Sequence, residues 1–235
     1  MFNFFSSSNI FFIIEKIIKF INSIFFIILF IGLTFALVIS PPDYLQGEVV
    51  RIMYIHVPAA WISLACYSTI AFLSILNFIF KIKNLILINK SIAPIGLLFT
   101  CLSIITGSLW GQPTWGAWWV WDARLSSMLV LLFFYIAYIL TIKIIKPEFL
   151  AIKISSVIAI LGSVNVPIIK YSVDWWNTLH QPASIRIDGS SSIHSSMMLP
   201  LLLMLLVILL YCALIFLMKY KTEIIRIKKK NIKRL

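Results

Sequence analysis

Charged residues are scarce in this sequence: Asp, Glu, Lys and Arg together make up 12% of its 235 residues, whereas hydrophobic residues make up 61%. A water-soluble domain of this length has a much more polar composition, so this class is excluded. The mean hydropathy of +1.02 is typical of a polytopic membrane protein. The first 15 residues contain no small-residue cleavage site after a short apolar core, so we expect no removable signal peptide.

Several chemical signatures are also missing. The three cysteines stand alone in apolar runs without a C-x-x-C pair, which argues against a dithiol redox site. No P-loop occurs, so we expect no ATP hydrolysis by this chain. The apolar runs contain no chain of Asp, Glu or Lys, which disfavours a proton-coupled pump or carrier.

Six apolar runs are each long enough for a membrane-spanning helix, which needs about 20 residues. The sequence therefore predicts an all-α polytopic membrane protein, with one integral membrane domain over residues 1–235 and a basic tail over 219–235. The six predicted spans are about 17–39, 54–80, 91–109, 125–142, 150–169 and 197–218.

The basic residues are distributed unequally between the two sides that these six spans define. Sixteen of the 20 lie on the side of the termini, and only Arg51, Arg124, Lys170 and Arg186 lie on the other. Basic residues concentrate on the cytoplasmic side of membrane proteins, so we expect the termini to face the cytoplasm or the mitochondrial matrix. We therefore attribute the net charge of +12 to residues that orient the protein in the membrane and contact lipid headgroups. We expect no nucleic-acid partner.

The most unusual stretch, residues 107–126, lies on the opposite, outer side. It holds five tryptophans, Trp110, Trp115, Trp118, Trp119 and Trp121, followed by Asp122 and Arg124. Gly111, Pro113 and Gly116 argue against a regular helix through its first half. Tryptophan rings splayed by such a backbone can form a broad apolar bed, which suits a flat, apolar ligand with polar edges, such as haem. The alternative is an interfacial aromatic belt, but the inner boundaries contain no tryptophan.

All three histidines also fall in outer segments. His56 lies near the start of the second span, close to Trp61, and His180 follows the pair Trp175–Trp176. His194 lies among serines. Imidazole is a common axial ligand of haem iron, and we expect His56 and His180, each beside aromatic residues, to bind the iron from opposite faces. Arg51 or Arg124 is a candidate partner for a haem propionate, although Arg124 could instead pair with Asp122.

The pattern Trp110-Gly-x-x-x-Trp-Gly-x-Trp-Trp-x-Trp-Asp122-x-Arg124-Leu resembles the WWD signature of haem-handling membrane proteins. Together with residues 51–61 and 170–181, it is similar to the cytochrome c maturation protein C branch. The resemblance covers about residues 40–200 and assigns the two axial histidines to His56 and His180. It implies that Trp110, Trp115, Trp118, Trp119, Trp121 and Asp122 form the WWD site for haem b.

The resemblance also implies partners. These are the haem chaperone, cytochrome c maturation protein E, and an ABC-type complex of the maturation A, B and D proteins. The protein would then bind and transfer haem without catalysing a reaction. One alternative is a haem lyase that attaches haem directly to apocytochrome c, although such synthases are usually longer and have more histidines. Another is a plain permease subunit of an ABC transporter, for which the short inner loops offer no clear coupling helix.

The abundance of Ile, Phe, Lys and Asn suggests an AT-rich genome. We therefore expect a multi-pass protein of the mitochondrial inner membrane, with the WWD segment facing the intermembrane space. A bacterial inner membrane, with the segment facing the periplasm, is the alternative.

Overall fold

In a computed structural model of the protein, the described residues are 7–181 and 193–232, and every regular element among them is a helix. Arg186, residues 1–6 and the last three residues of the basic tail lie outside this part. The elements are α1 (Ser7–Thr34), the π-helix η1 (Phe35–Ile39), the 3₁₀-helix η2 (Glu48–Ile52), α2 (Met53–Phe80), α3 (Lys83–Trp115), α4 (Ala123–Ile144), α5 (Glu148–Ser163), α6 (Asn165–Trp175) and α7 (Ser195–Ile232).

Six helical stretches in the described residues are long and apolar enough to cross a membrane, which confirms the predicted fold class. Most helices run further than the apolar cores that predict them. α7, for example, continues from Ser195 through the basic tail to Ile232. The backbone hydrogen bonds of a helix continue past the point where its side chains become polar. Hydropathy alone therefore predicts helices that are shorter than the observed ones.

The end of α3 differs from the sequence expectation. Instead of breaking at Gly111 and Pro113, the helix continues to Trp115. Gly116 then terminates it with φ +74° and donates its N–H to the carbonyl of Gln112. Pro113 has no N–H and so removes one helical hydrogen bond, and only two residues of α3 follow it. Gly111 is needed for packing, because a Cβ there would lie 2.9 Å from the Trp115 ring.

The fifth predicted span is the continuous stretch Glu148–Trp175, in which α5 and α6 meet at Val164, a residue that itself has helical dihedral angles. Next to this junction, the Asn165 side chain donates to the Ser127 carbonyl of α4 at 2.8 Å. α6 then continues to Trp175, beyond the expected boundary at residue 169. α6 packs along α4 toward the outer end of the protein, where the second predicted histidine lies.

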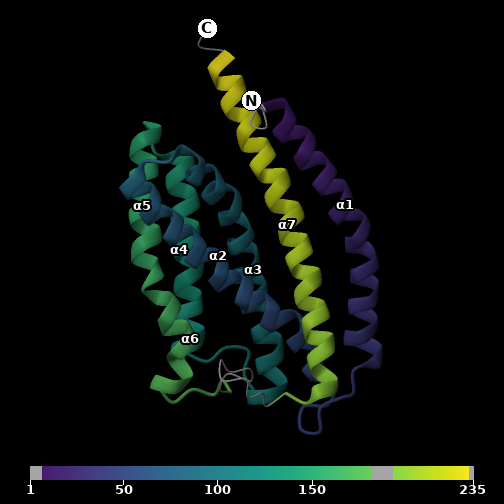
Figure 1. The fold of residues 1–235 in the computed structure, drawn as a ribbon. Coiled ribbons are helices and arrows are strands. Elements are labelled where there is room, and N and C mark those ends of the chain that lie inside the picture. The colour runs from purple at the N-terminus through teal and green to yellow at the C-terminus, as the bar shows by residue number, and fades with distance from the viewer. Residues whose placement is uncertain (1–6, 182–192, 233–235) are drawn as a thin grey trace.

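The helices form two groups, visible in Figure 1. α1 packs mainly against α7, while α2, α4, α5 and α6 enclose a second core around Tyr67, Leu131 and Tyr135. α2 and α3 pack extensively and join the two groups. Tyr135 is fully buried and donates to the Ser63 carbonyl at 2.7 Å, which fixes α4 against α2.

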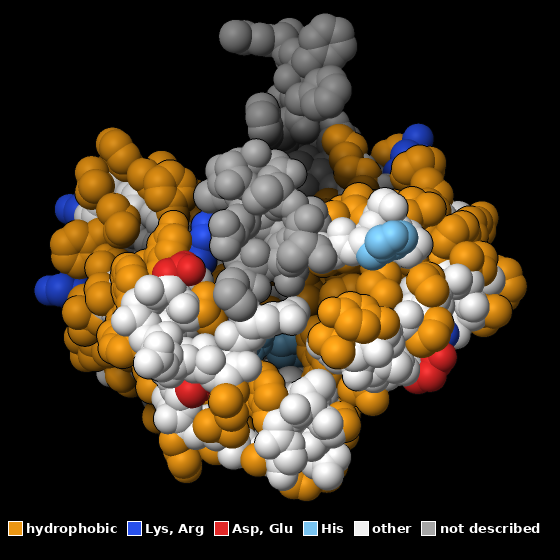
Figure 2. All heavy atoms as spheres, turned by 90° about the horizontal axis from the view of Figure 1, so that it is seen from below, with side chains coloured by type: hydrophobic (Ala, Val, Ile, Leu, Met, Phe, Trp, Pro, Cys, Tyr) orange, Lys and Arg blue, Asp and Glu red, His pale blue; other side chains and the backbone are white. Residues whose placement is uncertain are grey.

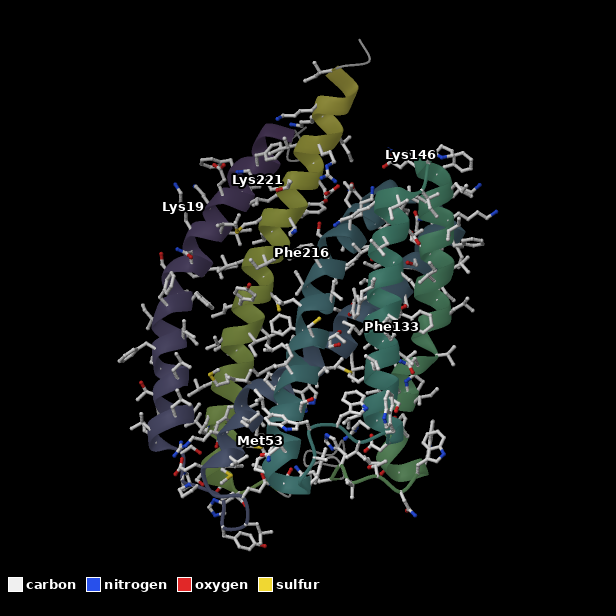
Figure 3. All side chains as sticks on the ribbon, turned by 180° about the vertical axis from the view of Figure 1, so that it is seen from behind. Lys19, Met53, Phe133, Lys146, Phe216 and Lys221 are labelled. Carbon is white, nitrogen blue, oxygen red and sulfur yellow. The ribbon has the colours of Figure 1, made fainter. Side chains whose placement is uncertain are left out.

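The two ends of the bundle differ in the residues they carry. Both chain termini lie at one end, together with Lys19, Lys146 and Lys221 (Figure 3). Met53, three residues before His56, lies toward the other end. The predicted separation between a basic end and a histidine- and tryptophan-bearing end is therefore present in the fold.

Candidate functional site

A cavity of about 690 Å³ lies among α2, α3, α4 and α6, toward the end of the bundle away from the termini. Ligand pockets in proteins commonly measure about 300–1,000 Å³, so this cavity suits a large organic ligand. Figure 2 views this end and shows histidine atoms at the base of a hollow. The predicted site residues that line the cavity are His56, His180, Trp110, Trp115, Trp119 and Arg124.

His56 lies near the start of α2, and its Nδ1 is 3.0 Å from the Thr106 hydroxyl on α3. That hydroxyl is also 2.7 Å from the Leu102 carbonyl, which can only accept, so the threonine hydrogen points there. Thr106 therefore accepts the Nδ1–H of His56, and the lone pair of the imidazole lies on Nε2. A neighbour that fixes the ring and its tautomer in this way is typical of histidine ligands of metals.

Gly107 provides the space for the His56 ring. A Cβ at residue 107 would lie 3.0 Å from His56 Cε1, closer than nearly all ordinary contacts. Pro58 is the sixth residue of α2 and removes one hydrogen bond from its second turn. The proline is fully buried, and α2 continues through it to Phe80.

His180 reaches the same cavity from the loop after α6. Its Nδ1 lies 3.1 Å from Arg124 Nη1 and 3.2 Å from the carbonyl oxygen of Gln181. Burial, and secondarily the charge of Arg124, lower the pKa of His180 to about 4. The ring is therefore neutral at neutral pH, as a metal ligand must be. Arg124 can only donate and the Gln181 carbonyl can only accept, so the two favour opposite tautomers of this ring. The Nε2 lone pair is free for a metal in the tautomer whose Nδ1–H donates to Gln181.

The His56 and His180 rings lie close together, with centroids 6.4 Å apart and planes inclined by 32°. An imidazole nitrogen ligates a transition metal at about 2 Å, so two rings on opposite sides of one ion have centres on the order of 6 Å apart. The hydrogen bonds of the two rings to Thr106, Arg124 and Gln181 all use Nδ1. The donor set and its spacing fit one iron held between two histidines.

Two tryptophans flank these histidines. The Trp110 ring meets His56 edge to face with centroids 5.7 Å apart, and its Nε1 donates to the Gln46 side chain at 2.8 Å. The Trp115 ring lies 5.9 Å from His180. Each candidate ligand therefore has an aromatic neighbour that limits the access of water to it.

Trp119 is the third tryptophan of the cavity wall, and its indole N–H is buried without a hydrogen-bond partner among the described residues. Leaving a buried donor unpaired costs about 1–3 kcal/mol. A bound molecule with an oxygen acceptor at its edge would satisfy this donor, and haem, with two propionates, is such a molecule.

The remaining WWD residues lie outside the cavity wall. Trp118 and Trp121 are 60% and 78% exposed. Asp122 accepts the Leu125 N–H at 2.8 Å and so caps the N-terminus of α4. The five rings therefore do not form one flat bed, because the extended chain after Gly116 turns some of them inward and others outward.

The two predicted propionate partners have different surroundings. Arg51 pairs with Glu48 and donates to the Ala36 carbonyl at 2.9 Å, away from the cavity wall. Arg124 lines the cavity and forms no ion pair with Asp122; its guanidinium instead donates to the Ile169 and Lys170 carbonyls, both at 3.3 Å. The structure therefore places one of the two candidates, Arg124, beside the site.

His194 lies apart from the other two histidines. Its exposed ring contacts Ser196 at the start of α7 and does not line the cavity. Sequence reasoning missed Thr106, Gly107 and Lys170, which lie at or beside the cavity. Thr106 and Gly107 are small residues about one helical turn before Trp110 in an otherwise apolar helix. Their small size was the sequence signal that could have identified these two residues.

Comparisons with known proteins show the family of this chain. The profile of a family described as Heme exporter protein C matches residues 1–234. Heme exporter protein C of Bradyrhizobium diazoefficiens is 40% identical over 200 residues, which cover 85% of this chain and 76% of that protein. A cytochrome c biosynthesis ccmC-like mitochondrial protein of Marchantia polymorpha is 43% identical over 187 residues, covering 80% and 79%. Heme exporter protein C of Escherichia coli K12 is 40% identical over 205 residues, covering 87% and 82%. The chain therefore belongs to the Heme exporter protein C family.

Proposed function

We propose that this protein binds haem b in the described cavity and delivers it, at the outer membrane face, to the haem chaperone of c-type cytochrome biogenesis. The observation that carries the proposal is the pair His56 and His180, whose rings are 6.4 Å apart in a cavity lined by tryptophans. The names of the relatives, which describe haem export and cytochrome c biosynthesis, support it.

The outer location rests on charge. Lys19, Lys146 and Lys221 lie at the end opposite the cavity (Figure 3). By the positive-inside rule, that end faces the matrix or the cytoplasm and the cavity faces the other compartment. Relatives described as mitochondrial in Marchantia polymorpha and Arabidopsis thaliana favour the mitochondrial inner membrane, with the WWD segment toward the intermembrane space.

In this proposal haem is cargo. His56 and His180 would hold its iron, Trp110, Trp115 and Trp119 would cover its apolar surface, and Arg124 and Lys170 are the lining cations available for its carboxylates. The protein acts as a delivery component and not as an enzyme. Its partners are the haem chaperone, cytochrome c maturation protein E, and the A, B and D proteins of an ABC-type complex, which would supply nucleotide hydrolysis.

The histidine assignment predicts a distinct spectroscopic result. His56→Gly and His180→Gly should each lose six-coordinate, low-spin haem and regain it when free imidazole fills the vacated position. His194→Gly is the control and should keep the wild-type spectrum, because its ring lies outside the cavity. Absorption spectra of the purified variants test this. Loss of low-spin haem in His194→Gly but not in His180→Gly would show the assignment to be wrong.

Thr106 should act through His56. Thr106→Val keeps the shape of the side chain but removes the acceptor of the Nδ1–H. Loss of such a supporting hydrogen bond typically weakens metal binding about 10–100-fold. We therefore expect faster haem loss and a shifted reduction potential, both restored in Thr106→Ser. A valine variant with wild-type potential and haem retention would contradict a positioning role for Thr106.

Trp119 and Trp118 are neighbours with opposite surroundings, which makes them a matched pair. Trp119→Ala should weaken haem binding by about 1–3 kcal/mol because a buried aromatic contact is lost. Trp118→Ala should bind haem normally, because that ring is exposed and outside the cavity wall. Haem off-rates measured with a haem scavenger compare the two. Equal off-rates in both variants would refute a role for Trp119 in retention.

Arg124 should recognise a carboxylate of haem. Wild type is expected to bind haem more tightly than its dimethyl ester, and in Arg124→Gln this difference should largely disappear. It should persist in Arg51→Gln, since Arg51 already pairs with Glu48. Binding titrations with both ligands give the difference for each variant. If Lys170→Gln removes the difference and Arg124→Gln does not, Lys170 is the partner.

A further inference from the structure

The cavity extends well below the two histidines. On α2 its wall continues from His56 through Leu64 and Ala65 to Ser68. Twelve residues of α-helix correspond to about 18 Å. Because these residues belong to the membrane-spanning stretch Glu48–Phe80, this deep arm reaches into the depth of the bilayer.

The α2 side of the deep arm is formed by side chains with accessible surface. Trp61 is 37% exposed, and Ala65 and Ser68, one and two turns further along α2, are also exposed although they line the cavity. Accessible surface can face a cavity as well as the exterior, so the packing of α2 against its neighbours decides whether the arm is closed at this edge.

α6 forms the opposite edge of this wall. Val166 and Ile169 of α6 line the cavity, yet α2 makes few contacts with α6 and packs instead along α5. Direct packing between α2 and α6 is therefore sparse on the outer half of the bundle, and the lining side chains of Ala60, Ala65 and Ser68 on α2 are small.

At this depth, the medium outside the bundle is the hydrocarbon of the bilayer, about 30 Å thick. We propose that the cavity opens sideways onto the bilayer between α2 and α6, and that haem dissolved in the membrane is loaded through this opening. The proposal rests on the proposed haem-binding function. The chemistry of the ligand matches that of the arm. The haem macrocycle is apolar over most of its surface. The arm is lined mainly by apolar side chains and leads without interruption to His56 and His180.

The test uses two adjacent small residues of α2. Ser68→Trp adds a large ring to the opening, whereas Thr69→Trp adds the same ring at the same depth at an exposed residue that does not line the cavity. Ala65→Trp serves as a second blocking variant. Each full-length protein is reconstituted into vesicles whose lipid contains haem, with apomyoglobin outside to trap haem that leaves the membrane. Loading is followed by low-spin haem absorbance and repeated with haem supplied from serum albumin in the aqueous phase.

We expect Ser68→Trp and Ala65→Trp to load several-fold more slowly from the membrane than Thr69→Trp and wild type, with unchanged spectra and unchanged loading from albumin. Membrane loading at the wild-type rate in both blocking variants would overturn the side opening. Equal slowing from both sources would also overturn it, because the new ring would then only perturb the binding cavity. Absence of haem uptake by wild type from either source would refute the proposed function itself.

Discussion

The distance between two imidazole rings is the constraint on which the rest of this structure depends. His56 comes from the start of α2 and His180 from the loop after α6. Their ring centroids are 6.4 Å apart because the membrane spans that carry them are packed in a defined arrangement. α2 and α6 themselves make few contacts; α2 packs on α3 and α5, and α4 packs on α5 and α6. Tyr135 joins α4 to α2, and the Asn165 amide joins α6 to α4.

These joining contacts are polar hydrogen bonds inside an apolar bundle. In a membrane, hydrophobic burial does not distinguish a neighbouring helix from lipid, so close packing and interhelical hydrogen bonds choose the partner. Gly162 shows the packing side of this rule: a Cβ there would lie 2.1 Å from the Tyr67 hydroxyl. The same devices recur at the site, where Gly107 admits the His56 ring and Thr106 accepts its hydrogen.

Arg124 connects the scaffold to the candidate ligands. It begins α4, its guanidinium bonds to two carbonyls of α6, and it also contacts His180 Nδ1. A single arginine therefore helps to position α6 and borders the cavity beside His180. Asp122, its neighbour in the motif, caps the helix through Oδ1 and does not pair with it. The motif combines a structural function, the start of α4, with residues that face the cavity.

The sequence by itself determined the membrane class, the helical fold, the six spans, the basic end and the family, because hydropathy, charge and the WWD pattern are local properties that need no partner. Only the tertiary structure decided which tryptophans face the cavity, which arginine lies beside it and which residue orients His56. Trp118 and Trp119 are identical in type and adjacent in sequence, yet one is exposed and the other lines the cavity. Likewise, Thr106 is 50 residues from His56, and only the packing of α3 against α2 brings them together. Such pairings arise from contacts between helices distant in the chain, and neither periodicity nor composition records them.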